Sequence, residues 1–249
     1  MATCWAAPLG DCKGKITGEH LFSKGIFAPS GNKVTIDGAP WFHGVPKEIS
    51  LAAAVGNILC EHHNCKLGTY ADPAAIQLRE AIKQSLENKP EPAAGVSYVR
   101  TPGGLVIPRP LITIAGPHYG AWLVKTHCNM LANSGGTPAI EYVRYAFSPR
   151  NPAIRFLYPS VKGESVEYTA TAHAGYVNFD EPGEPFMIHI GGHWTFVTLQ
   201  DLPQLAYMNR NDRAVLFKWD GASLAFDWSA DPSEIGSGAV ITATSVGRR

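Results

Sequence analysis

This chain of 249 residues has no excess of charge of either sign. Lysine and arginine together number 21, aspartate and glutamate together number 21, and charged residues make up 17% of the sequence. Proteins that bind nucleic acid usually carry a basic patch, so this balance counts against tight nonspecific DNA binding. It remains compatible with a local basic strip.

Long apolar runs are also missing. Charged residues, glycine or proline interrupt every run well before the roughly 18 residues that a transmembrane helix needs. Residues 1–8 lack the basic start and apolar core of a secretory signal peptide. The sequence therefore predicts no membrane span and a cytoplasmic location.

Cysteine is scarce, and its distribution is uneven. With five cysteines, an odd number, and no secretion signal, a framework of disulfides is not expected. Four of the five fall within the first 65 residues, close to histidines, which favours metal binding there. The five are Cys4, Cys12, Cys60, Cys65 and Cys128.

The hydrophobic content of 45% is typical of a packed globular protein, and 25 glycines and 19 prolines indicate many turns and few helices. The strongest helix signal begins with Asp72 as N-cap and Pro73 at the first helical position. Apolar residues at helical spacing follow as far as Leu86. Residues 88–92 read as a linker, and a second helix is expected near residues 117–132. We predict two domains, residues 1–90 and residues 95–249.

The second half contains short β-like runs separated by turn residues, a pattern that favours an antiparallel sheet or sandwich. The predicted fold class is α+β, with a small metal-bound unit, a helix and a β-rich C-terminal domain. The expected strands are residues 34–36, 141–147, 154–158, 165–171, 186–190, 194–199, 214–219 and 223–228.

A structural zinc ion takes four Cys or His ligands in a tetrahedron. Cys4 and Cys12 supply one candidate pair, and Cys60 and His63 supply another with the short spacing of a knuckle that leads into a helix. His62 or Cys65 could replace one of these four ligands, and the sequence leaves that choice open. Because a small glycine-rich segment has little core of its own, a bound metal could contribute its folding energy.

A second group of residues suits hydrolysis of a phosphodiester. Histidine titrates near neutral pH, so His20 is the candidate general base. Glu19 and Asn64 offer the oxygen ligands that a hard Mg²⁺ or Mn²⁺ ion prefers. Lys24 and Lys66 are the candidates for contacting the phosphates of a nucleic acid.

The segments Glu19-His20-Leu21-Phe22-Ser23-Lys24 and Leu59-Cys60-Glu61-His62-His63-Asn64 resemble the ββα-metal (HNH) endonucleases on a zinc-bound treble clef. The later Trp122-Leu123-Val124-Lys125 adds a W-x-x-K helix like that of similar bacterial proteins. The resemblance covers roughly residues 4–70. It implies that His20 is the general base, that Glu19 and Asn64 hold the catalytic ion, and that Cys4, Cys12, Cys60 and His63 hold zinc.

The chain departs from that family in three places. The acid is Glu19 where aspartate is common, the first cysteine pair is widely spaced, and the roughly forty residues from His20 to Asn64 require an inserted loop within residues 28–48. We therefore carry two functions forward. One is a metal-dependent DNA endonuclease, plausibly a homodimer because double-strand cuts often pair two sites. The other is a non-catalytic, zinc-stabilised nucleic-acid or protein binding module.

The second predicted helix carries further polar residues. His118, Lys125 and His127 could form a phosphate-binding face, but we favour a solvated face or a contact between domains. Cys128 is expected to be a small core residue.

Overall fold

The computed structural model describes twelve stretches of the chain. They are residues 3–27, 33–37, 45–87, 98–100, 106–108, 111–150, 154–157, 173–178, 186–190, 193–199, 215–219 and 222–228. All structural statements below concern these residues.

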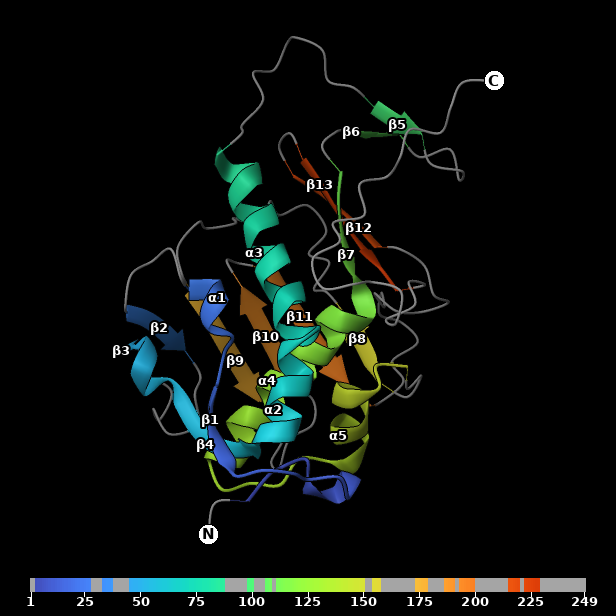
Figure 1. Cartoon of the computed structure of the whole chain (residues 1–249). Helices are drawn as coiled ribbons and strands as arrows, with labels where there is room; N and C mark the ends of the chain where they lie inside the picture. The colour runs from blue at the N-terminus through green and yellow to red at the C-terminus, as the bar shows by residue number, and fades with distance from the viewer. Residues whose placement is uncertain are drawn as a thin grey trace.

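The first part of the chain alternates short strands with helices (Figure 1). A short 3-10 helix, η1 (Ala7–Leu9), precedes β1 (Ile16–His20), α1 (Lys24–Phe27), β2 (Lys33–Asp37), β3 (Lys47–Ser50), η4 (Leu51–Ala53) and β4 (Val55–Cys60). Two helices, α2 (Glu61–Gly68) and α3 (Ala71–Glu87), follow directly.

The second part holds two more helices and most of the strands. Its elements are β5 (Tyr98–Arg100), β6 (Val106–Pro108), β7 (Leu111–Ala115), α4 (Gly116–Asn133), α5 (Ile140–Phe147), β8 (Arg155–Leu157), β9 (His173–Asn178), β10 (Phe186–Ile190), β11 (His193–Thr198), β12 (Val215–Trp219) and β13 (Ala222–Asp227).

The strands form four sheets. β1 pairs with β4, and β5 pairs with β6, both antiparallel. A six-stranded sheet has the order β3-β2-β9-β10-β11-β8, and a three-stranded sheet has the order β12-β13-β7. Two neighbouring pairs are parallel, β2 with β9 and β13 with β7. The β2–β9 pair joins the insert between β1 and β4 to the second half of the chain.

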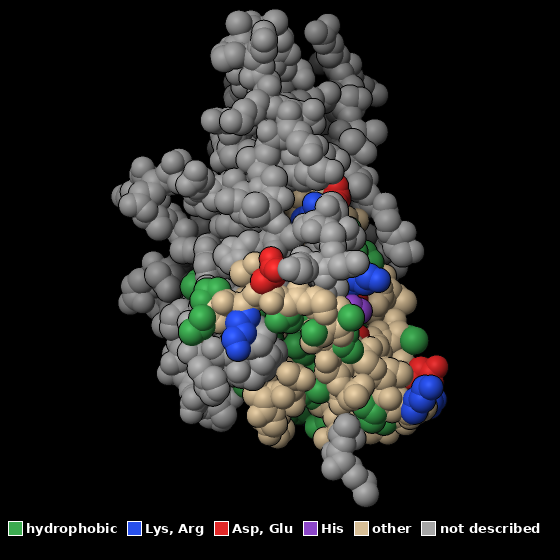
Figure 2. Space-filling view, turned by 90° about the vertical axis from the view of Figure 1, so that its left-hand side faces the viewer, with side chains coloured by type: hydrophobic (Ala, Val, Ile, Leu, Met, Phe, Trp, Pro, Cys, Tyr) green, Lys and Arg blue, Asp and Glu red, His purple; other side chains and the backbone are tan. Residues whose placement is uncertain are grey.

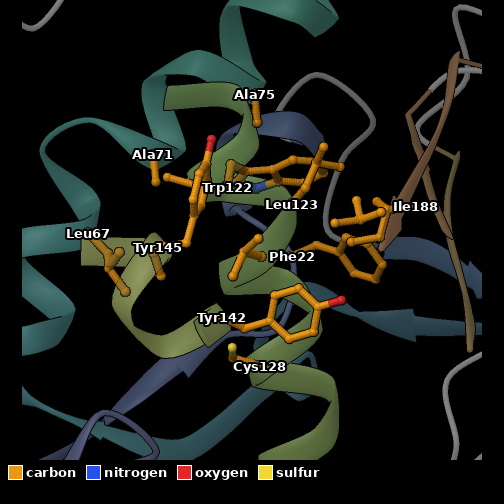
Figure 3. Close-up of a cluster of buried hydrophobic side chains, with 14 of the residues drawn as sticks. Phe22, Leu67, Ala71, Ala75, Trp122, Leu123, Cys128, Tyr142, Tyr145 and Ile188 are labelled. Atoms are coloured by element: carbon orange, nitrogen blue, oxygen red, sulfur yellow. The ribbon is translucent and has the colours of Figure 1, made fainter. Parts of the chain in front are cut away.

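Helix α4 lies at the centre of the core (Figure 3). Every residue from Gly116 to Leu131 is buried, which is the pattern of a helix covered on all sides. Pro117 stands in its first turn, where a missing backbone N–H costs nothing, and Gly135 with φ of 83° follows its end. Side chains from α2, α3, α5 and β10 converge on it; those drawn include Leu67, Ala71, Ala75, Tyr142, Tyr145 and Ile188.

Both predicted helices are present, with one correction at the first. Helix α3 starts at Ala71, so Asp72 lies inside the first turn rather than at the N-cap. Its carboxylate is engaged elsewhere, as described below. Ala75 and Leu78 of the predicted stripe are fully buried.

The expected strand over residues 141–147 is wrong, because this segment is helix α5. Its aromatic and β-branched residues suggested a strand. The buried residues Tyr142, Tyr145 and Ala146, however, follow the three- and four-residue spacing of a helix face that packs on α4.

The coarse fold class is confirmed, since the molecule mixes helices with small, mostly antiparallel sheets. The inserted segment 28–48 is more than a loop, because it contains β2 and the start of β3. The predicted linker 88–92 and strand 165–171 lie outside the described residues. Among the described helices, none is both long and apolar enough to cross a membrane.

Candidate metal centre

Two of the clustered ligands come from the junction between β4 and α2. Cys60 ends β4 with an extended backbone (φ −75°, ψ 157°) and caps α2, and His63 lies on the first turn of that helix. Residues three apart in a helix share one face. Cys60 Sγ and His63 Nδ1 are accordingly 3.2 Å apart.

The other two ligands lie in the N-terminal segment, which is tied to the same junction by backbone hydrogen bonds. Trp5 N–H donates to the carbonyl of Ile58, and the N–H groups of Glu61 and His62 donate to the carbonyls of Lys15 and Lys13. The latter two bonds satisfy N–H groups in the first turn of α2 that have no partner within the helix.

The wide spacing of Cys4 and Cys12 is accommodated by η1 between them. Gly10 and Gly14, with φ of 81° and 77°, supply left-handed turns on either side of Cys12. The extra residues therefore form a compact turn, and both cysteines reach the same place.

The four side chains form one cluster. Cys4, Cys12, Cys60 and His63 each offer a ligand atom, and all four atoms lie within 4.8 Å of one another. The sulfurs of Cys4, Cys12 and Cys60 lie 3.4, 3.6 and 3.2 Å from His63 Nδ1. With Zn–S near 2.3 Å and Zn–N near 2.0 Å, the S···N edge of a tetrahedron is about 3.5 Å. The donor set and spacing fit a zinc ion.

The pKa values of the three thiols shift in different directions. Desolvation raises the pKa of Cys4, and it raises the pKa of Cys12 to about 12, with the neighbouring thiols contributing. Burial also acts to raise the pKa of Cys60, but hydrogen bonds from the backbone N–H groups of His63 and Lys13 lower it overall. Three adjacent thiolates repel one another, and a bound metal ion removes that penalty.

Asp11 holds the other side of the His63 ring. Its carboxylate lies 2.7 Å from His63 Nε2 and 3.4 Å from His62 Nε2. A carboxylate behind a metal-binding histidine fixes its tautomer, so that Nδ1 is left to face the metal. The hydrogen bond from His63 lowers the pKa of Asp11.

The structure thus brings together the four residues predicted to bind zinc. Of the two alternatives left open by the sequence, His62 contacts Asp11, and Cys65 is exposed on α2 and absent from the cluster. Asp11 was not predicted. A carboxylate next to a ligand cysteine was the only signal for it in the sequence.

The residues predicted to be catalytic lie beside this centre. β1 carries Glu19 and His20, and its antiparallel register with β4 is shifted between Thr17 and Gly18. Such a bulge changes the direction of the side chains that follow it. Asn64, on α2, donates from Nδ2 to Thr17 Oγ1 at 3.1 Å and to the Gly18 carbonyl at 3.4 Å.

Glu19 is buried, whereas His20 is half-buried. Burial raises the pKa of Glu19, and Lys125 and a hydrogen bond from Asn64 oppose that effect. Burial lowers the pKa of His20, and the charges of Lys24 and Lys125 lower it further. Both effects favour the neutral imidazole, which is the form that a proton acceptor requires.

Lys125 was predicted to lie on a solvated face or at a contact between domains. The first alternative is wrong, because Lys125 is 1% exposed, whereas its contacts with residues of the first predicted domain fit the second. Its Nζ lies 2.5 Å from Glu19 Oε1 and 2.7 and 2.9 Å from the two carboxylate oxygens of Asp72. Ser23 donates a hydrogen bond to Asp72, and Trp122 Nε1 donates to Ser23 at 2.8 Å. Burying a charge requires such partners.

The other residues of α4 for which a prediction was made are also buried. His118 and His127 are buried, and the ring of His127 stacks on Phe186 at 3.9 Å between centroids. Neither belongs to a solvated face. Cys128 is a core residue as predicted, with burial raising the pKa of its thiol.

Lys24 and Lys66, the predicted phosphate contacts, are both exposed. Lys66 Nζ lies over the ring of Phe147 at 5.5 Å, and Lys24 is close enough to His20 to affect its pKa. On the face drawn in Figure 2, charged side chains of both signs are scattered among the described residues. The described residues of this face form no broad basic patch.

Comparisons with known proteins add no family to this description. No protein-family model, no curated protein and no solved structure matches the chain.

Proposed function

We propose that this protein is a metal-dependent endonuclease that hydrolyses phosphodiester bonds in DNA. One observation carries the proposal: β1 pairs with β4, β4 leads into α2, and this order gathers an acid–histidine dipeptide and Asn64 next to a Cys₃His cluster. In this proposal the unit is a zinc-bound treble clef of the ββα-metal type, and zinc has a structural role.

His20 is the general base in the proposed reaction. A half-buried imidazole whose pKa is lowered stays unprotonated at neutral pH and can accept a proton from an attacking water. The side chain remains partly accessible, as contact with a substrate requires.

Glu19 and Asn64 would hold a Mg²⁺ or Mn²⁺ ion. One oxygen of Glu19 is engaged by Lys125, and the amide nitrogen of Asn64 contacts Thr17, Gly18 and the Glu19 carboxylate. The second carboxylate oxygen and the amide oxygen are donors of the type that these ions bind. When bound, the ion would stabilise the negative charge that develops on the phosphate. Lys24 and Lys66, which are both exposed, would contact the phosphates of the DNA.

The test is cleavage of supercoiled plasmid by zinc-loaded protein in metal-free buffer, with Mg²⁺ or Mn²⁺ added back. This design avoids a chelator that would also remove zinc. We expect the wild type to nick or linearise the plasmid only with added metal, and His20→Ala to lose at least about a hundredfold in rate. Cys65→Ala, which changes an exposed residue of α2 outside the cluster, is the control and should retain activity.

A second candidate, a zinc-stabilised binding module without catalysis, is favoured by one observation. The Glu19 carboxylate is already paired with a buried ammonium group. Absence of cleavage by the wild type, together with a gel shift of the same DNA, would support this candidate over the nuclease. Equal cleavage by the wild type and His20→Ala would contradict the role given to His20.

A further inference from the structure

One side of α4 contacts the short segment that carries Glu19 and His20. The contacting residues are spaced by three and four positions, so they lie on one face of the helix. The contacts are Trp122 with Ser23, Lys125 with Glu19, and Asn129 Nδ2 with the backbone oxygen of His20 at 3.1 Å. Contacts with α4 therefore fix the position of the end of β1 and of the residues up to Ser23.

Lys125 has the most constrained of these contacts. A lysine ammonium has three N–H donors, and here three acceptor oxygens surround it. One belongs to Glu19, and the other two belong to Asp72. Asp72 in turn accepts a hydrogen bond from Ser23. The ammonium group cannot change direction without breaking one of these bonds.

Stability alone does not explain a lysine at this position. A buried ion pair often contributes no more to folding than apolar side chains of similar volume. A charged group in the core is better explained by a role in positioning another group. The group that Lys125 positions is the Glu19 carboxylate. Glu19 and Asp72 share this one ammonium group.

We propose that Lys125 is a positioning residue, fixed by Asp72, that holds the Glu19 carboxylate in place beside Asn64 and His20. The inference rests on the proposed function, because the position of Glu19 affects a rate only if Glu19 acts in the reaction. It extends the site from the β1–β4–α2 unit to α3 and α4.

The position of Asp72 allows a specific test. Asp72 contacts Lys125 and Ser23, and its side chain is 26% exposed, so Asp72→Asn removes charge without opening a cavity. We expect this variant to lower kcat for plasmid cleavage about tenfold, as with other residues that orient a ligand, while KM for DNA is unchanged. Glu80→Gln is the matched control, since Glu80 pairs with Arg79 on the same helix and should retain the wild-type rate.

A double-mutant cycle separates positioning from a general structural effect. Glu19→Asp keeps the carboxylate but shortens the side chain by one methylene, so the carboxylate no longer reaches Lys125. If Asp72 acts through Lys125 and Glu19, Asp72→Asn should have little further effect on kcat in the Glu19→Asp background. Urea unfolding of the wild type, the two single variants and the double variant, all zinc-loaded and without added Mg²⁺, gives a second readout. The effects of the two substitutions on the free energy of unfolding should be non-additive too.

The outcomes are distinct. Independent effects of the two substitutions on kcat, or an unchanged kcat in Asp72→Asn, would overturn the positioning role while the nuclease proposal stands. A wild type that cleaves no DNA with any metal would overturn the proposed function, and the positioning role with it. Lys125→Met tests the same coupling directly. If Lys125→Met does not fold because Lys125 is buried, Asp72→Asn still tests the positioning role.

Discussion

His63 is held through both nitrogens of its ring. Nδ1 faces three sulfurs, and Nε2 faces Asp11 at 2.7 Å. The rings of His63 and Phe147 meet edge to face, with their centroids 4.8 Å apart. A residue with so many fixed contacts leaves little freedom for a second arrangement of the metal ligands.

Two cysteines on or beside α2 provide a paired prediction. Cys60→Ala should lose bound zinc and the order of the N-terminal segment, because metal binding supplies folding energy that this segment lacks otherwise. Cys65→Ala removes an exposed thiol outside the cluster and should change the free energy of unfolding by no more than about 0.5 kcal/mol. Zinc content after gel filtration and circular dichroism measure both effects. Equal zinc content in the two variants would contradict the assignment of Cys60.

At the residue scale, sequence patterns were sufficient to predict the cluster of three cysteines and one histidine, and insufficient to predict the burial of Lys125. Cysteine and histidine are rare, so their clustering carries information, and the spacing of Cys60 and His63 matches a helical turn. Lysine is common and almost always exposed, so no local pattern predicts its burial. Its two partners are far away in sequence, at Glu19 and Asp72.

At the scale of elements, α4 and α5 show where local patterns succeed and fail. α4 was predicted from its apolar residues and its glycine-rich end. Its polar residues left a solvated face open as one alternative, and this is excluded because every residue from Gly116 to Leu131 is buried. α5 was mistaken for a strand. In both cases contacts with other elements decided the outcome, and single-segment patterns do not contain them.

The packing of α4 predicts the effect of filling a glycine. A Cβ at Gly120 would lie 2.7 Å from Tyr145 Oη and 2.8 Å from Phe156 Cζ. Gly120→Ala should therefore destabilise the protein by about 1–3 kcal/mol through overpacking.

Gly68→Ala is the control for that substitution. Gly68 ends α2, and the nearest contact of an added Cβ with another element is Asp72 Oδ2 at 4.0 Å. This variant should be neutral or slightly stabilising, since alanine favours helix. Urea unfolding of both variants measures the difference, and equal stabilities would show that the core around Gly120 can relax.

At the scale of the whole molecule, one contiguous core contains residues from both predicted domains. It includes Cys4 and Leu59 from the first part and Trp122, Ile188 and Phe226 from the second. The hydrogen bond from Trp5 Nε1 to Asn129 Oδ1, at 2.9 Å, also connects the two. The division near residue 90 stays a prediction, since residues 88–97 lie outside the described part.

Stability of the whole molecule should depend on pH through His20. Because its folded pKa is lowered, the unfolded chain binds more protons below the ordinary histidine value of about 6.5. The contribution of His20 is therefore present above that value and is lost as pH falls through the folded pKa.

Comparison of the wild type with His20→Gln isolates this contribution from the titration of the zinc ligands. Urea unfolding between about pH 7.5 and pH 5.5 should show the wild type losing stability relative to the variant as pH falls. Parallel curves would mean that His20 has the same pKa in the folded and unfolded states.

The contact of Lys125 with Glu19 also has a consequence for synthesis of the chain. The four clustered Cys and His residues are all present once residue 63 has left the ribosome, whereas the partner of Glu19 is translated much later. At about 5–20 residues per second, several seconds separate the two events. A zinc ion bound by these four residues could therefore enter the nascent chain first, and Glu19 acquires its final surroundings only after α4 has been made.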